Sequence, residues 1–282
     1  MRIRFWGVRG TIPTPGPDTV KLGGNTSCID ILTSDKQLII IDAGSGILRL
    51  GKTLQKEYPD RIKANILISH THWDHIQGFP FFSPVWGRHN RFIVVGQKRV
   101  GKQLEEILAN QFVEPYLPFQ YQTLPADLIV KEVEDGETII IGDDTAVTFA
   151  NLNHPGGCLG FRIENNGSIV TYCSDVGHPD GGFDPNVLQL ASGADLLIHD
   201  AHFTTMEEKA QKSDWGHSCW IEAVQIAVEA GVGCLALFHY SPDSEDTEME
   251  DILLNAREIF SRTILAREGM TVHLPMDGHL PD

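Results

Sequence analysis

The segment 66–75 constrains this chain more than any other part of its sequence. Its first three residues, Ile-Leu-Ile, are typical of a buried strand, and four side chains of the kind that bind metals follow within six positions: His70, His72, Asp74 and His75. Residues two apart in an extended chain point to the same side, so the first two imidazoles can converge on one ion. The next two begin a turn and can face an adjacent ion. The segment therefore predicts a strand end that supplies ligands to two metals.

Length and composition indicate a folded protein. The chain has 282 residues, 41% of them hydrophobic, which is enough for a buried core and argues against disorder. No linker, charge block or internal repeat marks a boundary, so we expect one domain over residues 1–282. No apolar run approaches the roughly 20 residues that cross a bilayer, and the first residues lack a signal-peptide stretch. We therefore expect a cytoplasmic protein with no membrane partner.

Charge and cysteine usage narrow the function. The five cysteines are scattered and never form a C-x-x-C pair, which favours buried thiols over disulfides or a zinc knuckle. The formal net charge is -16. Broad binding of nucleic acid requires many Lys and Arg side chains against the phosphates, so we expect no long nucleic acid as a partner. These features favour a small substrate.

The hydrophobic pattern predicts many short strands and a few helices. Runs rich in β-branched residues predict strands at 3–5, 28–32, 38–41, 66–68, 92–95, 138–141, 146–149, 168–172, 196–198 and 235–238. Apolar residues at helical spacing predict helices near 220–228 and 249–260. Ser218 is the expected N-cap of the first, and Gly231 its stop. Helices with one apolar stripe among many strands favour helical layers outside packed sheets.

Further candidate ligands follow apolar segments later in the chain: His154 in Asn-His-Pro-Gly-Gly, Asp175 in Ser-Asp-Val-Gly-His, and His239 in Phe-His-Tyr-Ser. Together with the H-x-H-x-D-H segment, they resemble the ordered ligand motifs of the metallo-β-lactamase superfamily. The resemblance implies an α/β fold, namely a four-layered αββα sandwich with the ligands on loops at one edge.

The same resemblance implies which residues bind which ion. One metal would be held by His70, His72 and His154, and the other by Asp74, His75 and His239, with the Asp175 carboxylate as a bridge. Imidazole and carboxylate ligands suit zinc, with manganese and iron as alternatives. We therefore expect two divalent metal ions per chain.

Two weaker matches narrow the family. Residues 5–13 and 23–28 are similar to the opening of the branch that contains ribonuclease Z and the phosphoribosyl cyclic phosphodiesterases. Asp200 and His217 lie in segments that resemble phosphodiesterase motifs, which supply an acidic residue and a histidine to the scissile phosphate. Asp42 matches an acidic residue beneath the metals that orients a ligand histidine.

These residues imply a mechanism. Hydroxide held between the metals would attack phosphorus, Asp74 would orient the water, and His217, kept cationic by Asp200, would protonate the leaving group. Structural roles for the last two, as a helix-end histidine and a buried carboxylate, remain open alternatives. Asn25 and Ser27 either reach the substrate phosphate or simply form a turn. We assign no ligand role to the remaining histidines.

A small phosphodiester, such as a cyclic nucleotide or a cyclic ribose phosphate, is the favoured substrate. Ribonuclease Z carries its tRNA-binding arm between the third metal histidine and the bridging aspartate. Here only 21 positions separate His154 from Asp175, and strand-like segments around Phe161 and Ile169 fill them. The alternatives are a ribonuclease Z-like RNA endonuclease, a thioester or lactone hydrolase, and a non-catalytic nucleotide-binding module.

Extra length lies at about 100–128, where a helical and aromatic insertion is expected. A helix with apolar spacing at Leu104, Ile107 and Leu108 leads into an aromatic-rich stretch: Phe112, Tyr116, Phe119 and Tyr121. These aromatics could cap the metal cleft and stack on a base, form a homodimer contact, or pack the insertion down.

Overall fold

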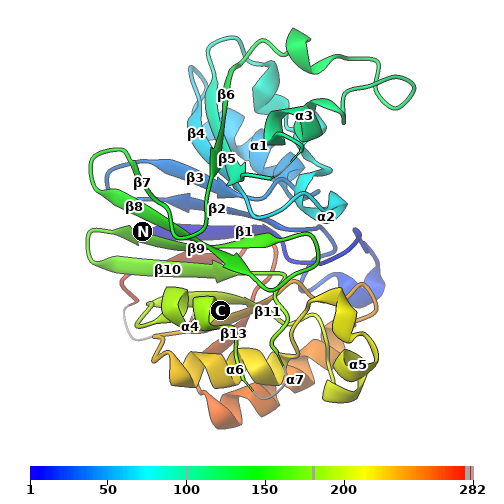
Figure 1. Cartoon of the computed structure of the whole chain (residues 1–282), viewed down its shortest axis with the longest axis vertical. Coiled ribbons are helices and arrows are strands. Elements are labelled where there is room, and N and C mark those ends of the chain that lie inside the picture. Colours follow the sequence, from blue (N-terminus) through cyan, green and yellow to red (C-terminus); the bar gives the residue numbers. More distant parts are fainter. Residues whose placement is uncertain (100, 180–181, 277–279, 281–282) are drawn as a thin grey trace.

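The strands of the computed structural model form two mixed sheets that pack face to face (Figure 1). The structure describes residues 1–99, 101–179, 182–276 and 280, and within these residues each sheet has seven strands. The first sheet has the order β14 (Thr271–His273), β1 (Arg2–Gly7), β2 (Cys28–Leu32), β3 (Leu38–Ile41), β4 (Lys63–Ile68), β5 (Arg91–Gln97) and β6 (Asp127–Val133). The second has the order β13 (Thr263–Leu265), β12 (Leu235–Phe238), β11 (Leu196–Asp200), β10 (Ser168–Cys173), β9 (Cys158–Asn165), β8 (Thr145–Leu152) and β7 (Thr138–Ile141).

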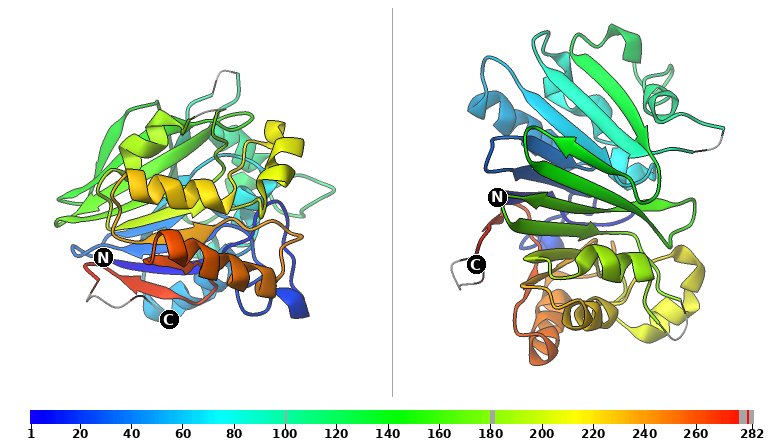
Figure 2. Two further views of the ribbon diagram at one scale, coloured as in Figure 1. Left: turned by 90° about the horizontal axis from the view of Figure 1, so that it is seen from below. Right: turned by 60° about the vertical axis from the view of Figure 1, so that its left-hand side comes forward.

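Helices cover the outer faces of both sheets. The first sheet carries α1 (Ile47–Glu57) and α3 (Leu104–Ala109), and the second carries α4 (Pro185–Ala191), α6 (Trp220–Glu229) and α7 (Asp246–Ile259). Figure 2 shows α6 and α7 side by side. The short helix α2 (Trp73–Ile76) lies in the connection between β4 and β5, and α5 (Met206–Gln211) in the connection between β11 and α6. Across the described ranges, every helix is too short or too polar to span a membrane.

Burial on both faces of the first sheet explains the layers. Along β3, Ile39 and Ile41 join the core between the two sheets, whereas Leu38 and Ile40 pack into a separate core beneath α1. Successive side chains of a strand point to opposite faces, so this unbroken apolar run requires cover on both sides. The arrangement is helix, sheet, sheet, helix, and the predicted αββα sandwich is confirmed.

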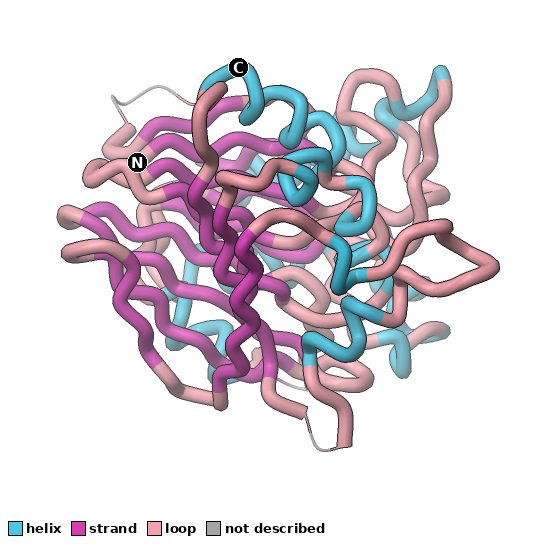
Figure 3. Tube along the Cα trace, turned by 90° about the horizontal axis from the view of Figure 1, so that it is seen from above, coloured by secondary structure: helices cyan, strands magenta, loops and turns pink. Residues whose placement is uncertain are grey.

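Strand direction brings many chain segments to one edge of the molecule. Strands β3 to β6 are parallel, as are β10 to β13, and in Figure 3 helices and longer loops gather at one end of the strands. Ligands of α/β proteins bind where the carboxyl ends of parallel strands meet. The loops that follow β3, β4, β10 and β12 therefore lie at the same edge of the sheets, although they are far apart in sequence.

The structure corrects some boundaries. Strands β6, β13 and β14 were not expected: the first is half-exposed, and the other two have only three residues each. Cys219, not Ser218, is the N-cap of α6, because its backbone N–H donates to the side chain of Glu222 in a capping box. The Ser218 hydroxyl donates instead to the carbonyl of Val176.

The insertion is partly packed and partly exposed. Phe112 is buried, with its ring centroid 6.2 Å from that of Phe79 and 5.7 Å from that of Tyr121. Tyr116 is 81% exposed and Phe119 48% exposed. Residue 100, where the predicted insertion begins, lies outside the described residues. Packing of the insertion onto the first sheet thus accounts for two of its four aromatics.

We predict that Phe161→Ala strongly destabilises the fold. The ring is fully buried between the sheets, 5.6 Å from Phe149 and 5.8 Å from Tyr172 by centroid. The loss of such a ring costs about 3–5 kcal/mol in the free energy of unfolding, because a cavity remains. Urea denaturation measures this change. Leu254→Ala, at a helix position that is 65% exposed, is the control and should shift stability by less than about 0.5 kcal/mol. Equal effects of the two substitutions would contradict the prediction.

Candidate metal centre

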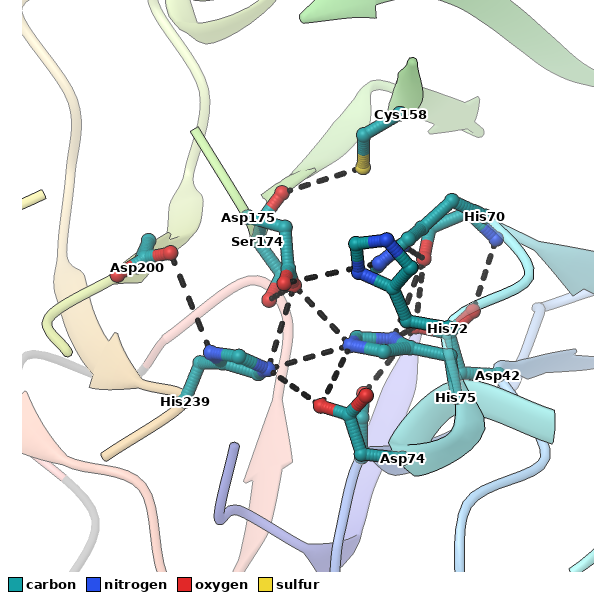
Figure 4. A network of polar contacts seen from close by, with 12 residues as sticks. Asp42, His70, His72, Asp74, His75, Cys158, Ser174, Asp175, Asp200 and His239 are labelled. Carbon is teal, nitrogen blue, oxygen red and sulfur yellow. Dashed lines mark hydrogen bonds and ion pairs between the residues drawn. The ribbon is translucent and has the colours of Figure 1, made fainter. Parts of the chain in front are cut away.

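Seven side chains converge at the carboxyl edge of the two sheets, most of them labelled in Figure 4. Five lie within four residues of a strand end: His70 and His72 after β4, His154 after β8, Asp175 after β10, and His239 after β12. The other two, Asp74 and His75, lie in α2, which begins immediately after His72. The register of the strands therefore sets the position of most of these groups.

The first group contains His70, His72 and His154. Nδ1 of His72 lies 3.2 Å from Nε2 of His154, and one nitrogen from each of the three rings falls within 4.8 Å of the others. Nε2 of His70 is buried and lacks a hydrogen-bond partner among the described residues. Buried polar atoms are nearly always paired, so this unpaired nitrogen indicates a missing ligand.

The second group contains Asp74, His75 and His239. Nε2 of His239 lies 3.1 Å from Nε2 of His75 and 3.1 Å from Oδ2 of Asp74. The backbone N–H of Thr11 donates to the same carboxylate oxygen at 2.8 Å. All three members are buried, so their polar atoms face one another rather than water.

Asp175 lies between the two groups. Its Oδ1 is 3.8 Å from Nε2 of both His70 and His154, while its Oδ2 is 3.1 Å from Nε2 of His75 and 3.3 Å from Nε2 of His239. Burial would raise the pKa of this carboxyl, but the surrounding imidazoles hold it well below its usual range. The carboxylate thus stays ionised and offers one oxygen to each group.

Asp42 supports the second group from below. Its Oδ2 lies 2.7 Å from Nδ1 of His75, and this nitrogen donates to the carboxylate oxygen. The same oxygen accepts hydrogen bonds from the hydroxyls of Ser69, Tyr172 and Ser27. This contact fixes the tautomer of His75 and points its Nε2 lone pair toward the cluster, as expected from the sequence.

Asp200 and His217 form a pair beside the cluster. Oδ2 of Asp200 is 2.7 Å from Nδ1 of His217, and that nitrogen is 3.9 Å from Oδ1 of Asp175. Burial opposes both charges, yet each partner favours the charge of the other. The pKa of His217 is raised, and that of Asp200 is lowered to about 2. The structure therefore brings together a histidine and a carboxylate at the edge of the cluster, and each favours the charged form of the other.

A further histidine stacks on this pair. The ring of His202 lies 4.3 Å from that of His217 by centroid, at an interplanar angle of 17°. Burial, followed by the neighbouring His217 and His239, lowers the pKa of His202 to about 3, so this ring is neutral near pH 7. One of its nitrogens falls within 4.8 Å of nitrogens of His217 and His239. It lies beside the second group and packs against the pair.

Backbone strain accompanies the site. Asp42, Asp175 and His239 have φ angles of 59°, 55° and 60°, in the left-handed region that non-glycine residues rarely adopt. Each stands within two residues of a strand end. Such conformations cost about 1–3 kcal/mol and cluster at functional sites, because there the strain directs a side chain where a relaxed turn would not.

The cavity above the cluster measures about 620 Å³, a size that suits a small molecule. Side chains of both groups line it, together with Asp175 and His217. Trp73 and Trp215 line it as well. Neither tryptophan was predicted to have a role, although Trp73 lies within the H-x-H-x-D-H segment and Trp215 beside Gly216 and His217. Their exposure could not be inferred from spacing.

Several expected substrate contacts lie elsewhere. Ser27 is fully buried beneath Asp42, and the side-chain amide of Asn25 donates to Glu268 at 3.0 Å. Neither lines the cavity, and none of the four aromatics of the insertion does so. Direct contacts of Asn25 and Ser27 with the phosphate, and a cap of insertion aromatics over the cleft, are therefore not supported. Both roles required side chains to point in directions that the packed fold uses for other contacts.

Residues 37–240 match a family model described as the beta-lactamase superfamily domain, which is well over half of the chain. The chain belongs to the metallo-β-lactamase superfamily. Ribonuclease Z of Bacteroides fragilis, a curated relative, is 29% identical to this chain over 291 aligned residues. The alignment covers 84% of this chain and 90% of that protein. Ribonuclease Z of Treponema denticola is 25% identical, with coverage of 86% and 91%. The expected branch of the superfamily is confirmed.

Solved structures of the superfamily have the same fold. The metallo-β-lactamase fold protein YhfI from Bacillus subtilis is similar with a TM-score of 0.72 at 21% identity, covering 96% of this chain and 98% of that one. A diphosphatase of the PhnP family gives a TM-score of 0.70 at 16% identity, covering 98% of each chain. At such low identity these similarities demonstrate the fold alone.

Divalent metals fit the two groups of this metallo-β-lactamase fold protein. The donors are imidazole nitrogens and carboxylate oxygens, which borderline ions such as zinc prefer. The buried, unpaired Nε2 of His70 is accounted for if it binds an ion. The protein is thus a hydrolase of a metal-dependent family with residues placed to hold metal.

We predict two divalent ions per chain, measured by elemental analysis of zinc-supplemented protein. His154→Ala should lower the stoichiometry by about one ion, because it removes a donor from a group of three. His273→Ala, at an exposed histidine of β14, is the matched control and should retain both ions. Removal of metal by a chelator should also lower the Tm, since a ligand that binds only the folded state stabilises it. Equal metal content in the two variants would contradict the assignment.

We predict that Asp42→Asn weakens metal binding about 10- to 100-fold, because it removes the carboxylate that orients His75 and makes it more basic. Competition with a chromophoric chelator measures this affinity. Asp60→Asn, at an exposed carboxylate, should leave it unchanged. A circular dichroism spectrum equal to that of the unmodified protein would show that the fold is intact, and unchanged affinity would then overturn the prediction.

Proposed function

We propose that this protein is a metal-dependent phosphodiesterase that hydrolyses a small phosphodiester, such as a cyclic nucleotide or a cyclic ribose phosphate. Two divalent ions, zinc for preference, would serve as cofactors. The observation that carries this proposal is the buried Asp200–His217 pair beside Asp175. A cluster that merely bound metal would not need a proton donor at its edge, whereas cleavage of a phosphodiester does.

Each of the two groups would hold one metal ion. His70, His72 and His154 would hold one ion, Asp74, His75 and His239 the other, and Asp175 both. When bound, such ions supply an activated water at neutral pH and neutralise charge on the phosphate. The contacts of Asp74 with Thr11 and His239 use Oδ2, which leaves Oδ1 to accept a hydrogen bond from the attacking water.

His217 would act as the general acid. When the bond between phosphorus and the leaving oxygen breaks, that oxygen needs a proton. Nδ1 of His217 donates to Asp200, so Nε2 carries the proton that is available to the cavity. The ionised Asp200 keeps the imidazolium charged until transfer, and solvent restores the proton afterwards. Hydrolysis of a cyclic diester then opens the ring and yields one product, which carries a phosphate monoester and a free hydroxyl.

The chain between His154 and Asp175 favours a small substrate. Strands β9 and β10 form a hairpin there, with register from Ser168–Asn165 to Tyr172–Phe161. This hairpin occupies the interval where a tRNA-binding arm would otherwise be inserted. The net charge of -16 also opposes long polyanions.

Ribonuclease Z activity is the second candidate, because the curated relatives carry that name. A panel of substrates separates the candidates: a 2′,3′-cyclic nucleotide, a cyclic ribose phosphate, bis(p-nitrophenyl) phosphate, a precursor tRNA, a thioester and a lactone. We expect the zinc- or manganese-loaded protein to hydrolyse the small diesters at least tenfold more efficiently than precursor tRNA, by kcat/KM. Preference for the tRNA, or turnover of the thioester or lactone alone, would overturn the proposal.

We predict that Asp74→Ala abolishes turnover of the small diesters, because it removes both a donor of the second group and the acceptor for the attacking water. The circular dichroism spectrum should remain that of the folded protein. Asp60→Ala, at an exposed carboxylate outside the cluster, should keep full activity. Retained turnover in Asp74→Ala would contradict its role.

We predict that His217→Ala lowers kcat for a cyclic nucleotide about 10²- to 10⁴-fold, the usual contribution of a general acid. The loss for bis(p-nitrophenyl) phosphate should be much smaller, because p-nitrophenolate leaves without protonation. Metal content, measured in parallel, should stay the same. An equal loss with both substrates would show that His217 does not protonate the leaving group.

A further inference from the structure

Two tryptophans stand at the mouth of the cavity. Trp73 is 68% exposed and Trp215 is 46% exposed, and both line the space above the cluster. Large aromatic surface is costly to leave in water, so exposed indoles at a cavity suggest a ligand rather than core packing. Neither ring is used by the proposed hydrolysis.

Both tryptophans belong to the side of the cavity formed by His72 and His154. Trp73 follows His72 directly in the chain. The carbonyl of Gly216, next to Trp215, accepts a hydrogen bond from Nδ1 of His154 at 2.9 Å. The two histidine rings approach to 3.2 Å. The two indoles are therefore attached to neighbouring parts of the same wall.

Trp215 is held by its surroundings. The ammonium of Lys212 lies 4.8 Å from the centre of the indole and pairs with Glu208 at 3.0 Å. Gly216 has a φ of 73°, and a Cβ there would come within 2.3 Å of Pro155. The chain must therefore turn sharply at Gly216, between Trp215 and His217 of the Asp200–His217 pair. This turn sets the direction of the Trp215 side chain.

Charge at the mouth limits what can bind. Asp214, next to Trp215, is exposed and also lines the cavity. Its carboxylate can accept a hydrogen bond from a sugar hydroxyl or an exocyclic amine, but it repels a second phosphate. A flat, neutral ring system attached to one phosphodiester satisfies both the indoles and this charge.

We propose that Trp73 and Trp215 form a stacking subsite for one heteroaromatic base. The favoured substrate is then a cyclic mononucleotide rather than a base-free cyclic sugar phosphate. This inference rests on the proposed function, because the base is positioned relative to a phosphodiester at the metal cluster. Stacking of a base on an aromatic side chain is independent of base identity, so the subsite selects for the presence of a base and not for its type.

Kinetics with paired substrates test the subsite. We expect Trp73→Ala and Trp215→Ala each to raise KM for a 2′,3′-cyclic nucleotide about tenfold, with kcat changed less than threefold, and to leave KM for a cyclic ribose phosphate unchanged. The Phe variants should restore most of the affinity, because they keep an aromatic face. Trp86→Ala, at a 38% exposed tryptophan outside the cavity lining, is the matched control. Metal content is measured for each variant to exclude an effect through the neighbouring ligands.

A binding measurement tests the same subsite without turnover. Adenosine 5′-monophosphate should quench the intrinsic tryptophan fluorescence of the zinc-loaded protein, and ribose 5-phosphate should not. The quenching should fall in each Ala variant and persist in Trp86→Ala.

The outcomes separate the two proposals. If the protein hydrolyses both cyclic phosphates and the Ala variants change KM for neither, or for both equally, the subsite is overturned and the proposed function stands. If the protein hydrolyses neither, the proposed function fails, and the fluorescence titration decides the subsite by itself. Absence of quenching by the nucleotide would overturn it.

Discussion

Asp175 offers one carboxylate oxygen to each of two groups of imidazoles, Oδ1 toward His70 and His154 and Oδ2 toward His75 and His239. A buried carboxylate is costly unless positive charge or hydrogen bonds compensate for the loss of water. Here the compensating groups come from three separate strand ends, so the two sheets must keep their register for the contact to exist. The centre and the sandwich therefore depend on each other.

The surrounding residues show how this contact is maintained. Asp42 fixes the tautomer of His75, while the carbonyl of Gly216 holds Nδ1 of His154. Left-handed backbone at Asp42, Asp175 and His239 turns each side chain into the cluster. Such strain persists only where the neighbouring packing over-determines the conformation. The largely buried strands β3, β10 and β12, which lead into these turns, provide that packing.

Much of the fold was predictable because its strands carry local signals. The apolar runs at 28–32, 38–41, 138–141 and 235–238 match the observed strands at both ends. Strands β13 and β14 escaped prediction because three residues hold too little pattern, and their pairing partners lie far away in sequence. The N-cap of α6 was misplaced by one residue, since Ser218 and Cys219 can both cap and only packing decides which hydroxyl or thiol is free to do so.

The sequence by itself determined the ligand-type residues, their order and the branch of the superfamily, because these follow from side-chain chemistry and spacing along the chain. Only the tertiary structure decided which atoms meet and which side chains stay exposed. Asp175 offers one oxygen to each group, and Ser27 donates to Asp42 instead of reaching the cavity. Trp73 and Trp215 remain exposed above the cluster. The physical reason is that ligand type is a local property of a residue, whereas distance and exposure depend on strands that are remote in sequence and adjacent only after folding.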